Sequence, residues 1–367
     1  DFNNPKPAHG NDGKWSSTYN SYSMTMSYNI TNEESVGRVT IKKVDAEDTS
    51  IVVKDATFKL VNSLTGELIG TQTTNEKGIA VFENIPFVSD SDAMQGHYYI
   101  EETTPGENHI LPETTRQYFD LTEDDANFEI TFANPPIKGD IEIVKIDKDD
   151  PNQKLSNATF TLYAINDTET PLKTAITDAD GKAVFKDCRY GEYVIKETTS
   201  PDNYYNDLKN GGNDDYWDAD LKGYVVKVDE NKKVIGLTIT NEKRYVEIEV
   251  VKVNEENKRL PNATFNIVAT DGTILDTIVT NVNGEAKSKL ISIEELGKNG
   301  YVIEAGNLPG YQEDRTKHFI DIDSNDTIKI QKVPLQIPNK KEPPQLKLEK
   351  VGADGKPAAA TFKVTRS

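Results

Sequence analysis

The stretch VTIKKVD at residues 39–45 alternates apolar and polar side chains, as a β-strand with one buried face does. The same pattern returns three times, as IEIVKID (141–147), IEVVKVN (248–254) and LKLEKVG (346–352). Successive copies lie about 100 residues apart, which is the size of a small domain. The chain is therefore expected to be a tandem array of similar domains.

Further segments repeat at the same period. Turns in which Asn or Asp leads into Gly follow in the first three copies, and each of these copies closes with an alternating strand that ends in asparagine. Short strands separated by turns, without a helical period, are typical of all-β, immunoglobulin-like sandwiches. Only SIEEL (292–296) is expected to form a helical turn. The second shared segments are DATFKL (55–60), NATFTL (157–162), NATFNI (262–267) and AATFKV (359–364).

The repeats predict the domain borders. The start of the chain resembles the closing strand of a repeat, and its end resembles only the opening strands of one. The predicted parts are the tail of a preceding β-domain (1–35), three β-sandwiches (36–136, 137–243 and 244–340) and the first strands of a following domain (345–367).

Composition excludes several classes of protein. The net charge of −19 argues against nucleic acid as a partner, because phosphates attract lysine and arginine. No apolar run is long enough to span a bilayer. The single cysteine, Cys188, rules out a disulfide framework, and we expect it in the core rather than as a nucleophile. These features fit a soluble surface protein that needs another kind of staple.

Polar residues continue the apolar, inward-facing stripes of several strands. Residues two apart in a strand share a face, so the lysine of each opening and the asparagine of each closing strand should point inward. A glutamate of a middle strand follows the same rule in the first two repeats. The inward sets are Lys43, Glu102 and Asn134; Lys145, Glu197 and Asn241; and Lys252 with Asn339.

A buried charge costs several kcal/mol unless it is compensated. One solution is a hydrogen-bonded ion pair, and another is a lysine whose ammonium reaches the rim of the sandwich. A third is chemistry, because burial favours the neutral amine and the neutral acid. A neutral amine is a nucleophile, and a neutral glutamic acid can polarise an asparagine carboxamide held in contact with it. The product is an amide bond between side chains.

The pattern resembles the Cna protein B-type (SpaA-type, prealbumin-like) domains of Gram-positive pilins and adhesins. The resemblance rests on the K-[VI]-D openings at Lys43–Asp45 and Lys145–Asp147, on the ATFxL segments, and on an "E-box" YxIxETxxP. The E-box is complete at Tyr193–Pro201 and one residue shorter at Tyr98–Pro105. In that family, lysine, asparagine and glutamate at these positions form an autocatalytic isopeptide bond.

The resemblance implies prealbumin-like sandwiches with a Lys43–Asn134 bond promoted by Glu102 and a Lys145–Asn241 bond promoted by Glu197. The third repeat departs from the E-box, because Ala305 takes the place of the glutamate and Glu304 has the opposite strand parity unless a bulge turns it inward. The Lys252–Asn339 bond is therefore left open. Two residues near the ends, Asn32 and Lys350, look like single members of incomplete triads.

Other candidate sites are weaker. The insertion at 203–224 is acidic and aromatic, and four of its aspartates offer hard oxygen ligands for calcium, although their spacing matches no EF-hand. A solvated loop is the alternative. The four histidines share no metal-binding spacing. We expect no cofactor and no enzyme activity beyond single-turnover self-cross-linking. The weak calcium candidates are Asp214, Asp215, Asp218 and Asp220.

Three functional hypotheses follow from the sequence. The repeats favour a structural stalk of a Gram-positive pilin or adhesin, which would be extracellular and anchored to the cell wall. A second hypothesis is an adhesin module that binds a host protein or glycan through the insertion at 203–224. A third is a non-catalytic array attached to a surface enzyme. The expected partners are neighbouring repeats, with sortase-linked pilin subunits, the cell wall and the host extracellular matrix implied by family only.

Overall fold

The computed structural model describes residues 15–20, 23–28, 36–87, 97–122, 124–206, 214–344 and 346–363, and for residues 15–28 it describes the backbone alone. Within these ranges every element is a strand except the helix α1 (Ile293–Leu296) and the 3-10 turn η1 (Asp214–Tyr216). The predicted all-β fold is confirmed. The predicted helical turn is α1, whose N-cap Ser292 accepts a hydrogen bond from the Glu295 amide at 3.2 Å.

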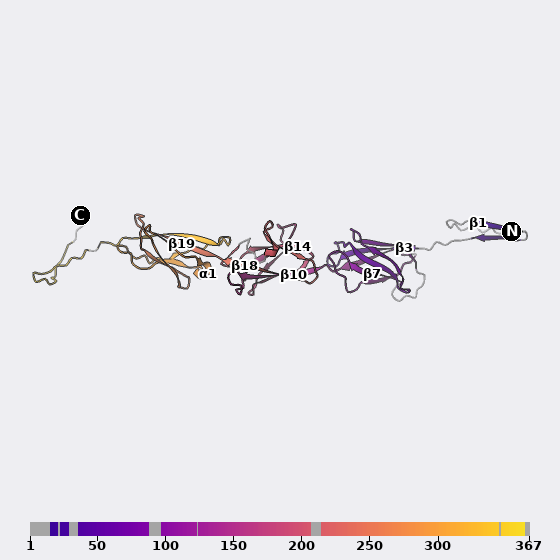
Figure 1. Cartoon of the computed structure of the whole chain (residues 1–367), viewed down its shortest axis with the longest axis horizontal. Helices are drawn as coiled ribbons and strands as arrows, with labels where there is room; N and C mark the ends of the chain where they lie inside the picture. The colour runs from indigo at the N-terminus through magenta and orange to yellow at the C-terminus, as the bar shows by residue number, and fades with distance from the viewer. Residues whose placement is uncertain are drawn as a thin grey trace. The chain divides into compact units, whose positions relative to one another are not determined.

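The first repeat contains two sheets, and strands of both carry labels in Figure 1. One sheet has the order β6-β3-β9 and the other the order β5-β4-β7-β8. The opening strand β3 and the closing strand β9 run parallel, whereas the other pairs are antiparallel. The strands are β3 (Val36–Asp45), β4 (Ala56–Asn62), β5 (Leu68–Thr73), β6 (Ile79–Pro86), β7 (Tyr98–Pro105), β8 (Arg116–Phe119) and β9 (Asn127–Asn134).

The second repeat has the same plan with added strands. Its sheets have the orders β13-β10-β18-β15 and β12-β11-β14-β17-β16. The strands are β10 (Lys138–Asp147), β11 (Thr159–Ala164), β12 (Lys173–Ile176), β13 (Lys182–Arg189), β14 (Gly191–Thr199), β15 (Tyr204–Tyr205), β16 (Trp217–Asp218), β17 (Gly223–Val228) and β18 (Val234–Lys243).

The third repeat follows the plan again. One sheet has the order β22-β19-β23 with β26 paired to β19, and the other has the order β21-β20-β24-β25. The strands are β19 (Tyr245–Asn254), β20 (Thr264–Val268), β21 (Ile274–Val279), β22 (Glu285–Lys287), β23 (Ile291–Ser292), β24 (Tyr301–Glu304), β25 (His318–Phe319) and β26 (Ile330–Asn339).

The regions near the two ends are simpler. Strand β1 (Trp15–Asn20) pairs with β2 (Ser23–Tyr28) in a two-stranded antiparallel sheet. Residues 346–363 contain an isolated bridge between Val351 and Pro357 and no longer strand. That these segments belong to neighbouring sandwiches stays a prediction.

Alternation of burial explains why the repeats fold as sandwiches. In β3 the side chains of Val39 and Ile41 are fully buried, and they pack against Phe58, Leu60 and Ile100 of the facing sheet. The third repeat has an equivalent core built on β19 and β20. Each core is closed by side chains from both sheets, which is how a sandwich of this size buries its apolar residues.

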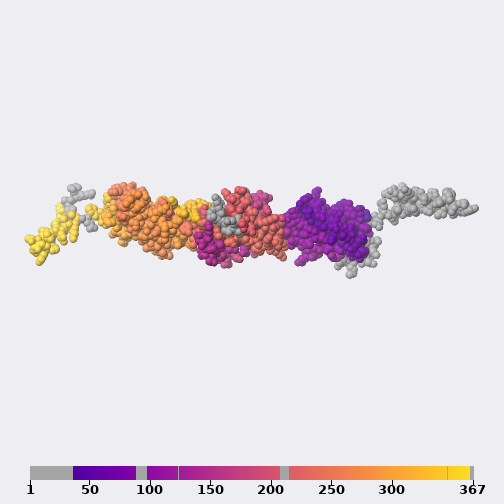
Figure 2. Space-filling model, viewed as in Figure 1, coloured from indigo at the N-terminus to yellow at the C-terminus, as the bar shows by residue number. Residues whose placement is uncertain are grey.

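Contacts divide the chain into two compact units. Unit 1 comprises Asp1–Gly139, Asp187–Gly191 and Val228–Lys233, and unit 2 comprises Asp140–Lys186, Glu192–Lys227 and Val234–Ser367. In the space-filling view, the residues of each repeat gather in one packed body (Figure 2). In the described part of the chain, no helix has the length and apolar character that crossing a membrane requires.

Candidate functional site

The inward lysines are the most unusual feature of the three cores. Lys43, Lys145 and Lys252 each have 0% exposure and are among the largest fully buried side chains of the chain. Each lies on the opening strand at the parity of the apolar stripe, so the predicted inward direction of all three is confirmed. None of them reaches the rim of its sandwich.

The closing strand brings an asparagine to each lysine. Because the opening and closing strands are parallel neighbours, the asparagine of the closing strand pairs with the residue two positions beyond the lysine, on the same face. All three asparagines are buried. The paired positions are Asp45 with Asn134, Asp147 with Asn241, and Asn254 with Asn339.

A glutamate from the facing sheet completes each set. It lies on β7, β14 or β24, opposite the phenylalanine of the ATF segment. The three pairs therefore occupy one common position in the fold. They are Phe58 with Glu102, Phe160 with Glu197, and Phe265 with Glu304.

In the first repeat the three groups meet with several polar atoms unpaired. Asn134 donates from Nδ2 to Glu102 Oε1 at 2.7 Å and to the Pro105 carbonyl at 2.9 Å. Lys43 Nζ lies 3.5 Å from Glu102 Oε1, which is an ion-pair distance without hydrogen-bond geometry. Lys43 Nζ, Asn134 Oδ1 and Glu102 Oε2 are buried and have no hydrogen-bond partner.

In the second repeat the same groups form a closed ring of hydrogen bonds. Lys145 Nζ donates to Asn241 Oδ1 at 2.6 Å and to Glu197 Oε2 at 2.7 Å. Asn241 donates from Nδ2 to Glu197 Oε1 at 2.9 Å. The amine thus lies against the carboxamide while the acid contacts both nitrogens.

The third repeat has the same ring. Lys252 Nζ donates to Asn339 Oδ1 at 2.5 Å and to Glu304 Oε2 at 3.2 Å, and Asn339 Nδ2 donates to Glu304 Oε1 at 3.0 Å. Glu304 is 5% exposed. A further donor, the backbone amide of Asp314, reaches Glu304 Oε2 at 3.0 Å.

The expected parity of Glu304 was wrong. Val302 and Glu304 share the buried face of β24, and no bulge is needed to turn the glutamate inward. The error came from aligning the strands on their first tyrosine. Tyr98 pairs with Asn62, four residues after Phe58, whereas Tyr301 pairs with Val268, three residues after Phe265. The pairing of phenylalanine with glutamate is the correct anchor, so Ala305 does not replace the acid.

Burial shifts the pKa values of the three lysines and of two of the glutamates in the direction that favours their neutral forms. Burial lowers the pKa of Lys43 to about 8, although the carboxylates of Glu102 and Asp45 oppose the shift. Burial also lowers the pKa of Lys145 and of Lys252. Burial raises the pKa of Glu102 and of Glu197, against the opposing effect of the nearby lysine. A neutral amine beside a neutral acid is the state that nucleophilic attack on a carboxamide requires.

Aromatic rings cover two of the sites. Lys145 Nζ lies 5.6 Å from the centroid of the Phe160 ring, and Lys252 Nζ lies 5.3 Å from that of Phe265. In the first repeat, Phe58 instead packs against Phe132, with ring centroids 4.9 Å apart. These rings help to keep water away from the polar groups.

The other residues singled out in the sequence do not join the Lys–Glu–Asn sets. Asn32 lies outside the described residues, as does the side chain of Asp214, and Lys350 is exposed. Within the described ranges, no group of three or more His, Cys, Asp or Glu side chains could hold a metal ion. Cys188 is buried at 2% exposure, in agreement with its expected place in the core. Asp215 and Asp220 are exposed, and Asp218 is half-buried.

Part of the insertion serves the fold of the second repeat. Tyr204 is 4% exposed, and its hydroxyl donates to Asp147 Oδ2 at 2.7 Å. The ring of Trp217 lies edge-on to that of Tyr224, with centroids 5.2 Å apart. These aromatic side chains are therefore engaged inside the repeat.

Sequence reasoning gave no role to the third residue of the K-[VI]-D opening. Asp45 and Asp147 are both almost fully buried and accept several hydrogen bonds. Their place in the shared motif was a signal, but their partners, such as His109 and Arg189, lie far along the chain and carry no shared spacing.

Comparisons with known proteins agree with this fold. Solved structures similar to the chain include the Bacillus anthracis TIE protein, with 25% identity and a TM-score of 0.59 over 86% of this chain and 54% of that protein. They also include BcpA, the major pilin subunit of Bacillus cereus, with 15% identity and a TM-score of 0.32 over 83% of this chain and 99% of that one. The chain thus spans about half the length of the TIE protein. No curated protein sequence matches significantly.

A family model gives the most direct assignment. The model of the SpaA prealbumin-like fold domain matches three times, at residues 37–136, 139–210 and 246–334. The matches cover more than half of the chain, and each lies within one of the three repeats. The chain therefore belongs to the SpaA family of prealbumin-like fold domains.

Proposed function

We propose that each of the three repeats forms an intramolecular isopeptide bond, joining Lys43 to Asn134, Lys145 to Asn241 and Lys252 to Asn339. The observation that carries the proposal is the Lys–Glu–Asn set between the two sheets, which occurs in all three repeats in one strand register. A register that brings a lysine and an asparagine to the same glutamate in every repeat supports a shared reaction better than three independent ion pairs.

The reaction needs only the groups present. The neutral lysine amine attacks the carbon of the asparagine carboxamide, and a new C–N bond forms as the bond to the carboxamide nitrogen breaks. The glutamate carboxyl, which lies beside both nitrogens, carries a proton from the lysine nitrogen to the departing carboxamide nitrogen, which leaves as ammonia. One amine and one carboxamide thus become one substituted amide and one ammonia, with no oxidant or cofactor.

The first repeat gives an energetic reason for the reaction. Three buried polar atoms of its Lys43, Glu102 and Asn134 set have no hydrogen-bond partner, and each such atom costs about 1–3 kcal/mol. Conversion of the amine to an amide removes the charge that burial penalises most. The unreacted arrangement is therefore a strained starting state, which favours the product.

We infer that the bonds harden a stalk. In each repeat the covalent bridge would join the opening strand to its parallel neighbour, the closing strand, so tension would pass through the bridge rather than through the residues between. The bond would close a loop that comprises nearly the whole repeat, from the lysine to the asparagine. By analogy with a disulfide, closing this loop would stabilise the fold by about 4 kcal/mol. Unlike a disulfide, an isopeptide bond resists reduction.

We place this stalk on the surface of a Gram-positive cell, as part of a pilin or adhesin. Membership of the SpaA family supports this setting. The proposed sandwiches span 36–136, 137–243 and 244–340, joined by short segments. Neighbouring repeats are the immediate partners, and cell-wall attachment is part of the proposal. The only reaction proposed is a single turnover on the chain itself.

Intact mass spectrometry of the purified chain tests the proposal. Each bond expels ammonia, so three bonds would lower the mass by about 51 Da relative to the sequence, at about 17 Da each. Glu102→Ala, Glu197→Ala and Glu304→Ala should each prevent one bond, so that one ammonia fewer is lost. Peptide mapping should assign the missing bond to the altered repeat. An intact mass equal to that of the sequence would overturn the proposal.

A further inference from the structure

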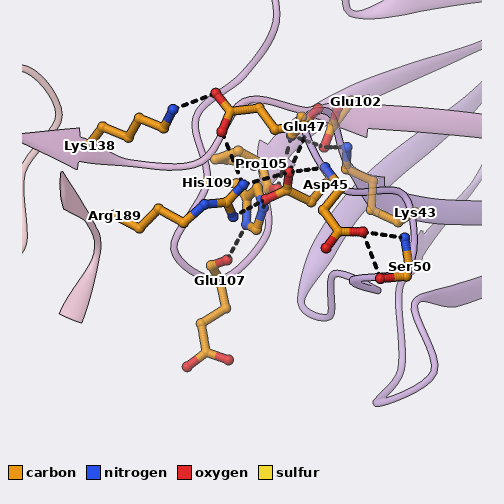
Figure 3. Close-up of polar contacts among 12 residues, drawn as sticks. Lys43, Asp45, Glu47, Ser50, Glu102, Pro105, Glu107, His109, Lys138 and Arg189 are labelled. Atoms are coloured by element: carbon orange, nitrogen blue, oxygen red, sulfur yellow. Dashed lines mark hydrogen bonds and ion pairs between the residues drawn. The ribbon is translucent and has the colours of Figure 1, made fainter. Parts of the chain in front are cut away.

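A buried carboxylate next to the first lysine has partners well beyond its own strand. Asp45 has a side-chain exposure of 0% and lies two residues after Lys43. One of its oxygens, Oδ1, accepts the amides of Glu47 at 2.7 Å and Asp48 at 3.0 Å, which closes the turn after β3. The other, Oδ2, lies 3.0 Å from His109 Nε2 (Figure 3).

An arginine of the second repeat completes this group. Arg189, the last residue of β13, donates from Nη1 to Asp45 Oδ2 at 2.7 Å and from Nη2 to Asp45 Oδ1 at 3.3 Å. Nη2 also reaches Glu47 Oε2 at 3.0 Å, and Lys138 Nζ reaches Glu47 Oε1 at 2.6 Å (Figure 3). We call Asp45, Glu47, Lys138 and Arg189 the Asp45 clasp.

Backbone contacts lie around the clasp. The amide of Tyr190 donates to the Ile137 carbonyl at 2.9 Å, and the amide of Lys138 donates to Asn231 Oδ1 at 3.2 Å. All these residues belong to unit 1, which takes in Asp187–Gly191 and Val228–Lys233 along with the first repeat. Two short segments of the second repeat therefore belong to the same compact unit as the first repeat.

The clasp is more than a surface ion pair, because one partner is fully buried. Burial alone would raise the pKa of Asp45, but hydrogen bonds from Arg189, from the two turn amides and from His109 hold it well below its usual range. A buried carboxylate needs such donors, and a bidentate guanidinium is the best match for its geometry. Arg189 keeps 37% of its side chain exposed, so only part of this interaction is shielded from solvent.

The third repeat shows that the position of Asp45 has two separate roles, closing the turn after the strand and binding cations. Its equivalent residue is Asn254, whose Oδ1 accepts the amides of Glu256 at 3.0 Å and Lys258 at 2.8 Å. Asparagine therefore suffices to close the turn. The charge of Asp45 is needed only for the cations that reach it from elsewhere, Arg189 above all.

We propose that the Asp45 clasp is a docking site through which the first repeat holds the following repeat of the same chain. The buried Asp45 carboxylate is the binding group on the first repeat, and the Arg189 guanidinium is the group on the second repeat that binds to it. The Glu47–Lys138 pair closes over the joint. This lock is non-covalent and does not depend on the isopeptide bonds, so it can fail or hold separately from them.

Hydrogen exchange of the full chain, read by mass spectrometry of peptides, tests the docking site. Asp45→Asn keeps the side-chain oxygen that closes the turn and removes the carboxylate charge, and Arg189→Gln removes the guanidinium that binds it. Both should raise exchange roughly tenfold or more in the peptides around residues 45–50, 135–138 and 188–191. Arg189→Lys should give an intermediate rise, since an ammonium cannot bind both oxygens as a fork. The matched control is Arg116→Gln, which breaks an Arg116–Glu101 ion pair within the first repeat.

The outcomes separate the docking site from other roles. Combining Asp45→Asn with Arg189→Gln should add little to either change alone, because each already breaks the same contact. The ammonia loss of the first repeat should remain in every variant. Exchange that stays at the wild-type rate in residues 135–138, or that rises equally in the Arg116→Gln control, would overturn the proposal.

Discussion

The first and third repeats hold the same three side-chain types in the same strand register, yet they satisfy them differently. Lys43 has no hydrogen bond, and one oxygen of Glu102 lacks a partner. Lys252 donates two hydrogen bonds, and Glu304 accepts from the Asp314 backbone in addition. A buried polar atom without a partner raises the free energy of the unreacted state. The first site is therefore primed for reaction, whereas the third rests in a better-satisfied ground state.

The largest expected effect concerns stability. Replacing Lys252 by Met together with Glu304 by Leu removes the third site without leaving a buried charge. If a bond forms there, the repeat should lose about 4 kcal/mol of unfolding free energy. If the site is only a buried ion pair, the same change should be neutral or stabilising. Denaturant-dependent hydrogen exchange, read in peptides of β20, assigns the change to this repeat.

The matched variant in the first repeat is Lys43→Met with Glu102→Leu. It should cost a similar amount, because the two bridges close loops of similar length. A loss in the first repeat without one in the third would show that satisfied hydrogen bonds keep the third site unreacted.

The acids give the next largest effect. Glu102→Ala and Glu304→Ala each remove the group that transfers protons, and general acid–base catalysis supplies about a hundredfold or more. After refolding of chain isolated unreacted from inclusion bodies, each variant should lose ammonia at least that much more slowly in its own repeat. Time-resolved peptide mapping measures both rates in one sample. A wild-type rate in Glu304→Ala would assign the acid of the third site to another residue.

The repeat period predicted both the fold and the inward lysines and asparagines, because strand parity follows directly from sequence. Aligning the repeats residue by residue failed to predict the position of Glu304, since β20 and β24 pair over a shorter span than β4 and β7. The hydrogen-bond differences between the sites could not be predicted, because they depend on angles and on loops such as the one holding Asp314. The partnership of Asp45 with Arg189 was equally hidden, as it joins residues of two different repeats.

A smaller effect should come from the additional donor in the third site. The Asp314 amide holds Glu304 Oε2 in a hydrogen bond that Glu102 lacks, and the acid must weaken this bond to carry a proton, which should slow the third bond roughly tenfold relative to the first, or about 1.4 kcal/mol. Asp314→Pro removes the N–H and should shorten the delay. Asp314→Ala keeps the N–H and removes only the side chain, so it is the control. Equal rates in the first and third repeats of the wild type would contradict this account.

The smallest expected effect is the pH dependence of the first bond. Burial lowers the pKa of Lys43 to about 8, so the neutral amine rises about fivefold between pH 7 and pH 8 and little above that. The rate of ammonia loss should follow this rise in the neutral amine. Glu102→Gln keeps an amide in place of the acid and should slow the reaction at every pH. A flat wild-type profile would mean that the proton moves from Lys43 to Glu102 within the closed site, without exchange with solvent. The unpaired polar atoms of the first site would then give it no difference in reactivity from the hydrogen-bonded third site.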